Sequence, residues 1–269
     1  MTRSTSILDE IVAAKHRELE VARQQFPQES LLEAIRAGTP PAFDAALQGD
    51  GLNIIAEVKY RSPSRGLFPC ELAPVEVARQ YRDSGAVALS VVTETAYFAG
   101  ASAYLEDIRE EFPALPLLRK DFLFEPYQVI ESRAWGASAI LAIVACLESS
   151  QLASLLCSAG EFQLGVLVEV HDPWELEIAL HEGAGIIGVN NRNLNDFQVD
   201  LATSFDIARR LEGEDGTLLI SESGLSERAQ LLELRDAGFS GFLIGSHFMN
   251  SQKPGEVLRE LLEGEKDGN

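Results

Sequence analysis

Eight short apolar runs alternate with amphipathic stretches from residue 53 to the last quarter of the chain. Continuous apolar runs of this length are typical of parallel strands that are buried on both faces. In order, they cover residues 53–59, 87–92, 116–120, 139–144, 165–170, 186–190, 217–222 and 241–245. Strands that alternate with helical stretches predict a series of βα units and a parallel sheet.

Several of the intervening helical stretches end in a glycine just before the next apolar run, at Gly85, Gly136, Gly183 and Gly238. Glycine at this place is typical of the residue that stops a helix. Eight βα units in a row predict an α/β protein with a closed (β/α)8 TIM barrel. The alternative is an open doubly wound sheet, whose first turn would carry a GxGxxG phosphate loop, and the sequence has none there.

The segment before the first apolar run has the pattern of two helices. Apolar and charged residues alternate with helical spacing over residues 7–21, where Ser6 can cap the helix, and a second short helix is predicted over residues 29–36. We therefore expect one domain over residues 1–269, with a helical extension over residues 1–50 and a barrel over residues 51–269. The apolar stripe must be buried, and the barrel mouth is the surface we expect it to cover; the alternative is the barrel bottom.

The composition of the chain limits which binding partners and which cellular compartment we expect for it. The formal net charge of -20 argues against general binding of nucleic acid or of an anionic membrane surface, because phosphate groups are held by clustered Lys and Arg. No apolar stretch is long enough to cross a bilayer, and the first residues lack an apolar signal core. The 3 Cys are far apart and the 4 His show no metal-ligand spacing. These features predict a cytoplasmic protein without a metal site.

Polar side chains gather near the carboxyl ends of the predicted strands, where barrel enzymes place their active sites. They are Glu57, Lys59, Lys120, Glu169, Asn190, Glu222 and Ser223. Taken singly, each carboxylate or lysine could be a structural ion-pair partner, and Asn190 could cap a turn. Together they place two lysines and three carboxylates around one mouth. A purely structural account explains this grouping poorly, because unpaired buried charges are costly.

Glycines after the last two strands predict a phosphate site. Ser223 and Gly224 follow the seventh run, and Gly245 and Ser246 follow the eighth. The loops after strands seven and eight often hold phosphate in such barrels, because glycine lets backbone N–H groups approach the oxygens. The alternative for Gly245 is a tight turn with no ligand.

Three other noticeable side chains are assigned structural places. His171 precedes Asp172 and Pro173, which suggests that it belongs to the start of a helix. Trp135 and Trp174 lie in predicted helices, and we expect both to pack in the interior.

Seven segments, in chain order, resemble the motifs of the indole-3-glycerol phosphate synthase family. They cover residues 55–66, 93–100, 118–122, 167–171, 188–194, 221–224 and 243–246. The likeness extends from the N-terminal helices to the last helix. Its most specific parts are the Glu-x-Lys-x-x-Ser-Pro-Ser stretch that starts at Glu57 and the Asn-Asn-Arg-Asn-Leu stretch that starts at Asn190.

The resemblance implies that the substrate is 1-(2-carboxyphenylamino)-1-deoxyribulose 5-phosphate. The enzyme would close the indole ring on this substrate, with loss of CO2 and water and without a cofactor, as a step of tryptophan biosynthesis. It also implies that Lys120 is the general acid that protonates the ribulose carbonyl oxygen, that Glu169 does acid–base work in the dehydration, and that Lys59 contacts the substrate carboxylate.

The resemblance further assigns Glu57 and Asn190 to the substrate hydroxyls and to developing charge. The phosphate would be held by Ser62, Gly224, Gly245 and Ser246. The rest of the pocket would be lined by Phe98, Arg192, Glu222, Ser223 and Leu243. For the proton transfers we expect burial and mutual repulsion with Lys59 to lower the pKa of Lys120, and a partly dry pocket to raise that of the glutamate.

Two alternatives have different functions. One is another sugar-phosphate enzyme of the same architecture, such as phosphoribosylanthranilate isomerase, which lacks the helical extension and the Glu57 and Lys59 strand. The other is an inactive barrel that serves as a binding subunit. The implied partner is a phosphorylated small molecule, with no nucleic acid and no membrane; the sequence specifies no contact with other tryptophan-pathway enzymes.

Overall fold

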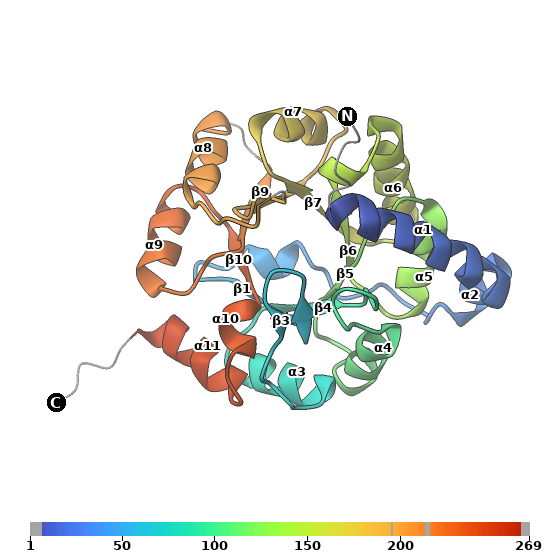
Figure 1. The fold of residues 1–269 in the computed structure, drawn as a ribbon, viewed down its shortest axis with the longest axis horizontal. Coiled ribbons are helices and arrows are strands. Elements are labelled where there is room, and N and C mark those ends of the chain that lie inside the picture. The colour runs from blue at the N-terminus through green and yellow to red at the C-terminus, as the bar shows by residue number, and fades with distance from the viewer. Residues whose placement is uncertain (1–6, 195, 213–215, 265–269) are drawn as a thin grey trace.

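A computed structural model describes residues 7–194, 196–212 and 216–264. Within these residues, eight parallel strands close into a barrel in the order β1-β10-β9-β8-β7-β6-β5-β4 (Figure 1). The barrel strands are β1 (Ile54–Val58), β4 (Ala88–Val92), β5 (Leu117–Lys120), β6 (Ala139–Ile143), β7 (Gly165–Val170), β8 (Ile186–Asn190), β9 (Leu218–Glu222) and β10 (Gly241–Ile244). Each lies within one residue of its predicted bounds, so the predicted (β/α)8 barrel is confirmed.

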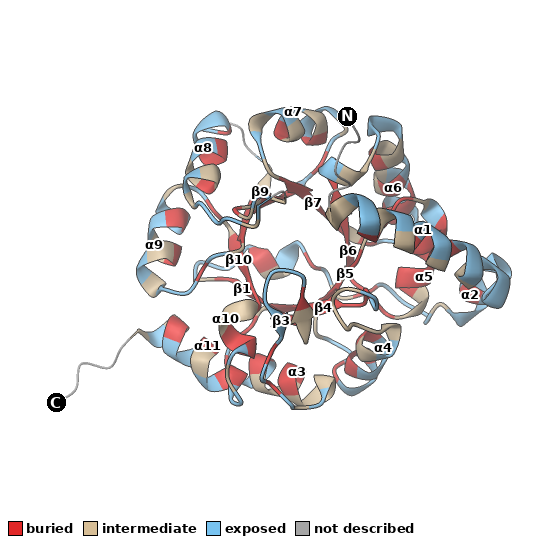
Figure 2. Ribbon diagram, in the orientation of Figure 1, coloured by how far each residue is buried: buried red, intermediate tan, exposed pale blue. Residues whose placement is uncertain are grey.

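Helices surround the barrel and bury one face each against it, as Figure 2 shows. They are α3 (Pro74–Asp83), α4 (Ser102–Glu111), α5 (Pro126–Ala134), α6 (Ser149–Glu161), α7 (Pro173–His181), α8 (Ala202–Arg210), α9 (Arg228–Asp236) and α11 (Pro254–Glu263), with short turns of helix at η1 (Ala45–Leu47), η2 (Val144–Cys146) and α10 (Ser246–Met249). None of the helices in the described residues is long and apolar enough to cross a membrane.

Backbone chemistry explains where the outer helices begin and end. Four of them, α3, α5, α7 and α11, have proline in the first turn, where no intrahelical N–H donor is needed. The predicted stop glycines Gly85, Gly136, Gly183 and Gly238 all have positive φ, which confirms their role. The interior place expected for Trp174 is wrong, because its side chain lies on the outer face of α7 and is 70% exposed.

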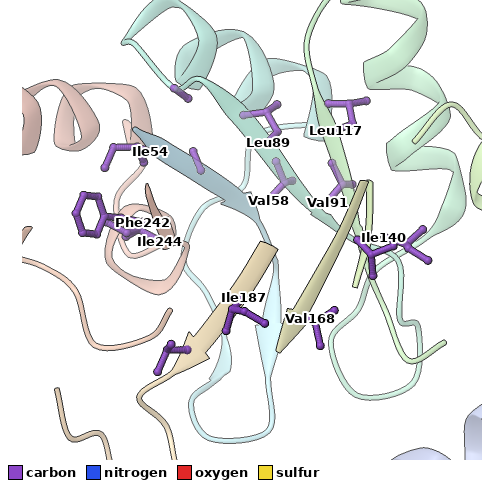
Figure 3. Packing of buried hydrophobic residues seen from close by; sticks show 14 of the residues in the cluster. Ile54, Val58, Leu89, Val91, Leu117, Ile140, Val168, Ile187, Phe242 and Ile244 are labelled. Carbon is purple, nitrogen blue, oxygen red and sulfur yellow. The ribbon is translucent and has the colours of Figure 1, made fainter. Parts of the chain in front are cut away.

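Alternation along the strands produces two apolar layers. One set of side chains points outward and packs under the helices; Figure 3 shows Ile54, Leu89 and Phe242 among them. The other set fills the inside of the barrel and includes Ile55, Leu118, Leu141, Leu167, Ile220 and Leu243. Because this inner core is packed, a ligand is expected at the carboxyl ends of the strands, where the cavity lies.

The first N-terminal helix, α1 (Ile7–Gln25), begins at the rim of the barrel mouth and runs outward from it, and α2 (Gln28–Ala34) lies beside α5 (Figure 1). Ile7, Leu8 and Ile11 of α1 line the cavity at the mouth. The expected cover over the mouth is confirmed for this first part of the apolar stripe, whereas Leu19 packs against α5 and Val21 is 51% exposed. The cap assigned to Ser6 lies outside the described residues.

The last part of the extension, which includes η1, lies at the opposite end of the barrel. Phe43 and Leu47 are buried in the inner core, and an ideal Cβ at Gly165, the first residue of β7, would lie 3.5 Å from Phe43. Asn53 fixes this segment, because its Nδ2 donates to the carbonyl oxygens of Leu47 at 3.0 Å and Ser240 at 2.8 Å. Residues 7–50 therefore contribute to both ends of the barrel.

Helix α1 is attached to the mouth by a buried ion pair. Lys15 Nζ lies 2.8 Å from Asp121 Oδ1, directly after β5, and only 7% of the Lys15 side chain is exposed. Burial alone would raise the pKa of Asp121, but Lys15 and Arg119 outweigh burial and lower it to about 2. This carboxylate therefore stabilises the fold above its unfolded pKa near 3.8, and that contribution is lost as the pH falls toward 2.

We expect Lys15→Met to lower the free energy of unfolding by about 3 kcal/mol, because breaking a buried pair leaves a buried charge with fewer partners. The pKa of Asp121 rises in this variant, so acid unfolding begins at a higher pH. KM rises as well, since α1 lines the cavity. Thermal unfolding against pH and steady-state kinetics check this. Lys253→Met is the matched control, because its ion pair with Glu256 is exposed. Equal effects of the two variants would show that the buried pair does not hold α1.

A two-stranded hairpin, β2 (Arg61–Ser62) and β3 (Gly66–Leu67), follows β1 and was not predicted. Its strands have two residues each, which is too short to produce an alternating pattern. The hairpin lies over the mouth in Figure 1 and holds the Ser-Pro-Ser stretch at the cavity.

Candidate active site

The period of two along the strands places the charged side chains at the mouth. Glu57, Lys120, Glu169 and Glu222 each follow an inward-facing apolar residue by two positions, at Ile55, Leu118, Leu167 and Ile220. Their side chains therefore form the next layer above the inner core. Strands far apart in sequence meet at this level because the barrel is closed.

Lys120 occupies the centre of this layer. Its Nζ lies 2.7 Å from Glu169 Oε2 and 2.7 Å from Glu222 Oε2. The side chain of Lys120 is 17% exposed, whereas those of the two glutamates are 4% and 3% exposed. The ammonium group is thus the part of the cluster most accessible to a ligand in the cavity.

The pKa expected for Lys120 is wrong in direction. Burial lowers the pKa of the ammonium group, but the charges of Glu169, Glu222 and Glu57 outweigh burial and raise it above its ordinary value. Mutual repulsion with Lys59 does not decide the outcome, because Lys59 Nζ forms its own ion pair with Glu57. Each lysine is compensated by carboxylates, so Lys120 is a cation in the free protein.

The two glutamates beside Lys120 differ in their protonation. Burial raises the pKa of Glu169, but Lys120 and His171 outweigh burial and lower it. Burial and the neighbouring charge of Glu169 raise the pKa of Glu222 to about 7, against the opposing effect of Lys120. The raised carboxyl pKa expected at the mouth therefore occurs at Glu222 and not at Glu169. The pair can hold one proton near neutral pH.

Asn190, at the end of β8, completes the layer. Its Nδ2 donates to Glu169 Oε1 at 3.0 Å, and its Oδ1 accepts from the backbone N–H of Arg192 at 3.0 Å. Asn190 therefore both caps a turn and orients Glu169. Ser90 Oγ lies 3.4 Å from Glu57 Oε2 and supports that carboxylate from β4.

Three of the residues predicted for phosphate lie just after the ends of β9 and β10, namely Gly224, Gly245 and Ser246, whereas the fourth, Ser62, lies on β2. Ser223 and Gly224 both have positive φ, at 69° and 82°, and an added Cβ at Gly224 would lie 2.2 Å from Val199. Non-glycine residues with positive φ are costly, and they are concentrated at binding sites. Gly245 contacts Glu57 so closely that a Cβ there would lie 2.5 Å from its Oε1.

One cavity of about 430 Å3 brings the predicted site residues together. Its lining includes Glu57, Lys59, Ser62, Phe98, Lys120, Glu169, Asn190, Arg192, Glu222, Ser223, Gly224, Leu243, Gly245 and Ser246. The rest of the lining consists of apolar side chains, among them those of α1 and of the strands, and of polar residues from the loops, such as Arg65, Glu94 and Asp121. The cavity thus has charged groups at its floor and a mixed wall suited to an aromatic ring.

Two supporting groups were missed by sequence reasoning. Glu94 accepts hydrogen bonds from the backbone N–H groups of Ala96, Tyr97 and Phe98 at 2.8–3.0 Å and so fixes the loop that carries Phe98. His171 contacts Glu169 from the end of the same strand. A polar residue at a strand end was the available signal for Glu94, and the motif Glu-Val-His was the signal for His171.

A third group lies beneath the mouth on the outside of β5. Arg119 is buried and pairs with Asp121 at 3.0 Å and with Glu131 at 2.7 Å, while its guanidinium lies 4.2 Å from the centre of the Trp135 ring. Trp135 therefore packs as expected, against a cation. This network fixes β5 on its outer side, so Lys120 points inward.

A closed barrel with a lysine held between two buried carboxylates, next to glycine-rich loops, defines an acid–base enzyme of the TIM-barrel class. The family model of indole-3-glycerol phosphate synthase matches residues 8–261. The chain belongs to this family.

Curated relatives agree over nearly the whole chain. The indole-3-glycerol phosphate synthase of Salinibacter ruber is 41% identical over 264 residues, which cover 97% of this chain and 97% of the relative. That of Chlorobium luteolum is 46% identical over 250 residues, which cover 91% of this chain and 94% of the relative. Enzymes of this family are lyases of tryptophan biosynthesis that act on a phosphorylated small molecule.

Solved structures with low identity share the fold. The 3-hexulose-6-phosphate synthase of Salmonella typhimurium has a TM-score of 0.61 at 13% identity, over 79% of this chain and 97% of that chain. The thiamine phosphate pyrophosphorylase of Pyrococcus furiosus has a TM-score of 0.57 at 16% identity, over 79% of this chain and 94% of that chain. These similarities bear on the barrel alone.

Proposed function

We propose that the cavity closes the indole ring of 1-(2-carboxyphenylamino)-1-deoxyribulose 5-phosphate, with loss of CO2 and water. The observation that carries this proposal is the position of Lys120, an ammonium group within 2.7 Å of two carboxylates at the accessible floor of the mouth. Ring closure forms a carbon–carbon bond and decarboxylation breaks one. For these steps and for the dehydration the protein has to supply proton transfers, and the cluster has donors and acceptors for them.

Lys120 is the general acid of the ring closure. As the aromatic carbon attacks the ribulose carbonyl carbon, the carbonyl oxygen takes a proton from the ammonium group and becomes a hydroxyl. Loss of CO2 then restores the aromatic ring. Lys120 is cationic in the free protein, and after the transfer its amine lies beside Glu222, which has a pKa of about 7 and can return a proton.

Glu169 is the acid–base group of the dehydration. Its pKa is lowered chiefly by Lys120, which overcomes the effect of burial, so it is ionised. It takes a proton from the ring carbon next to the one that carries the hydroxyl, while Lys120, reprotonated by Glu222, gives a proton to that hydroxyl, which leaves as water. Glu57 and Asn190 hold the substrate hydroxyls and stabilise developing charge. Asn190 also keeps Glu169 in place through its 3.0 Å hydrogen bond.

The anionic ends of the substrate are held by separate groups. Lys59, on β1's carboxyl side, contacts the substrate carboxylate, and Ser62, Gly224, Gly245 and Ser246 hold the phosphate through backbone N–H and hydroxyl groups. Phe98, Arg192, Glu222, Ser223 and Leu243 line the remaining pocket. All these residues line the same cavity, which supports a single bound substrate.

The biological setting proposed is that of a biosynthetic enzyme in the cytoplasm, without nucleic-acid or membrane partners. The chain's formal net charge of -20 supports the part of this proposal that excludes nucleic acid and anionic membranes as partners. We further propose that residues 1–269 act as one domain, because α1 both lines the cavity and pairs with Asp121 at its rim.

The purified chain tests the proposed function directly. The protein is given the carboxyphenylamino substrate alone, in buffer that contains a chelator. We expect the fluorescent indole product and CO2 to form in equal molar amounts. An isomerase of the same fold would consume phosphoribosylanthranilate and release no CO2. Absence of fluorescence and of CO2 from folded protein would contradict the proposal.

A further inference from the structure

His171 lies directly after β7 and stands between two carboxylates. Its Nε2 is 3.4 Å from Glu169 Oε1, and its Nδ1 is 3.0 Å from Glu175 Oε2. Its backbone N–H also donates to Glu175 Oε2, at 2.7 Å. The His171 side chain is only 12% exposed. A partly buried ring thus connects the proposed dehydration base to a second glutamate outside the cavity lining.

The start of α7 determines where this second glutamate lies. Asp172 caps the helix by accepting from the backbone N–H groups of Trp174 at 2.8 Å and Glu175 at 2.9 Å. The cap fixes the first turn, and the Glu175 side chain folds back onto the residue four positions earlier. Glu175 is therefore placed by the helix terminus rather than by the substrate site.

The ring nitrogen that faces the cavity has one evident partner. Among the described residues, His171 Nε2 is buried and makes no hydrogen bond of good geometry, and Glu169 Oε1 is the carboxylate oxygen that it faces at ion-pair distance. A buried donor at this place is costly unless it acts on that carboxylate. A small movement of Glu169 toward the ring would complete the bond.

Charges around the ring favour the imidazolium form. Burial lowers the pKa of His171, but hydrogen bonds and charges from Glu169 and Glu175 outweigh burial and raise it to about 10. Cys146 of η2 lies in the same region, where burial and the charges of Glu169, Glu175 and Asp9 raise its pKa to about 12 and keep the thiol neutral. The charged groups that act on the ring are thus Glu169 of β7 and Glu175 of α7.

We propose that His171 is a positioning residue for Glu169: clamped by Glu175, it orients Oε1 of Glu169 and keeps that carboxylate ionised until it takes the proton of the dehydration. The inference rests on the proposed role of Glu169. Lys120 holds the other oxygen, Oε2, at 2.7 Å, so the two cations act on different oxygens. A variant without the His171 imidazole loses the group that orients Glu169 and its positive charge, but it keeps Lys120, the proposed acid of the ring closure.

His171→Asn tests the inference, with His181→Asn as the matched control at an exposed position on α7. We expect kcat of His171→Asn to fall by roughly tenfold, the size of coupling that contacting residues show, while KM stays within about twofold. An opposite charge this close lowers a carboxyl pKa by about 1–3 units, so its loss moves the acidic limb of the kcat profile up by about one pH unit. Glu175→Gln leaves the His171 imidazole in place, and we expect it to shift the acidic limb of the kcat profile in the same direction by a smaller amount. An unmoved limb in both variants would overturn the inference.

A double-mutant cycle separates this inference from the proposed function. In a Glu169→Gln background, His171→Asn should cause no further loss of kcat, because the group that it positions is gone. Equal losses in both backgrounds would show that His171 does not act through Glu169 and would overturn the inference alone. Wild-type kcat in Glu169→Gln itself would instead overturn the role of Glu169, and the inference with it.

Discussion

Lys120→Met is expected to lower kcat by about 10²–10⁴-fold, the usual cost of losing a general acid. KM changes far less, because the proton is shared only in the transition state. The physical basis is the position of the ammonium group between Glu169 and Glu222, where it is the most exposed charge of the cluster. Methionine keeps the length of the side chain and removes the proton.

The same variant has a characteristic effect on stability. Without the cation, the carboxyl groups of Glu169 and Glu222 remain buried together, and their pKa values rise. A carboxyl group with a raised folded pKa loses stability as the pH increases above its unfolded pKa, near 4.5. The Tm deficit relative to wild type should therefore grow from pH 4.5 to 7.

Lys120→Arg separates the two effects. Arginine keeps a positive charge but is too weak an acid to donate its proton, so we expect it to recover much of the Tm and little of kcat. Steady-state kinetics and thermal unfolding of both variants check this. If Lys120→Met turned over substrate at nearly the wild-type rate, the acid role would pass from Lys120 to Lys59.

Gly245→Val is expected to lower kcat/KM by about 10²-fold, the cost of displacing a catalytic group by about 1 Å. A Cβ at this position would lie 2.5 Å from Glu57 Oε1 and 2.8 Å from Glu57 Cβ, so Glu57 must shift. The valine also covers backbone N–H groups proposed for phosphate. Both kcat and KM should therefore change.

Gly160→Val is the matched control, because an added Cβ at Gly160 in α6 meets no atom within 4 Å. Its kinetics should equal those of wild type. A rise of KM alone in Gly245→Val would mean that the phosphate contact matters and that Glu57 adjusts freely. Unchanged kinetics in Gly245→Val would remove Gly245 from the site.

The barrel could be predicted from the sequence because its information is local. Runs such as residues 139–144 are apolar along their whole length, and stop glycines such as Gly136 mark the preceding helix ends. The hairpin at Arg61–Leu67 was missed because two-residue strands have no period. The exposed Trp174 was misplaced because the side of a helix on which a residue lies depends on packing.

The grouping of the site could also be predicted, since the carboxyl ends of barrel strands meet at one mouth. The partner of each charge could not. Lys120 pairs with residues 49 and 102 positions away, and these contacts reverse the expected direction of its pKa. The role of α1 as part of the cavity wall likewise depends on Lys15 and Asp121, which no local pattern connects.

The central claim is that the charges at the mouth are catalytic and not merely structural, and kcat of Glu169→Gln tests it most directly. Glutamine keeps the shape of the side chain and can still accept a hydrogen bond from Lys120, so the fold should be retained. The account predicts that kcat falls by about 10²–10⁴-fold, with KM changed by only a few-fold. A near-wild-type kcat combined with a lower Tm would contradict it, because Glu169 would then be only an ion-pair partner of Lys120.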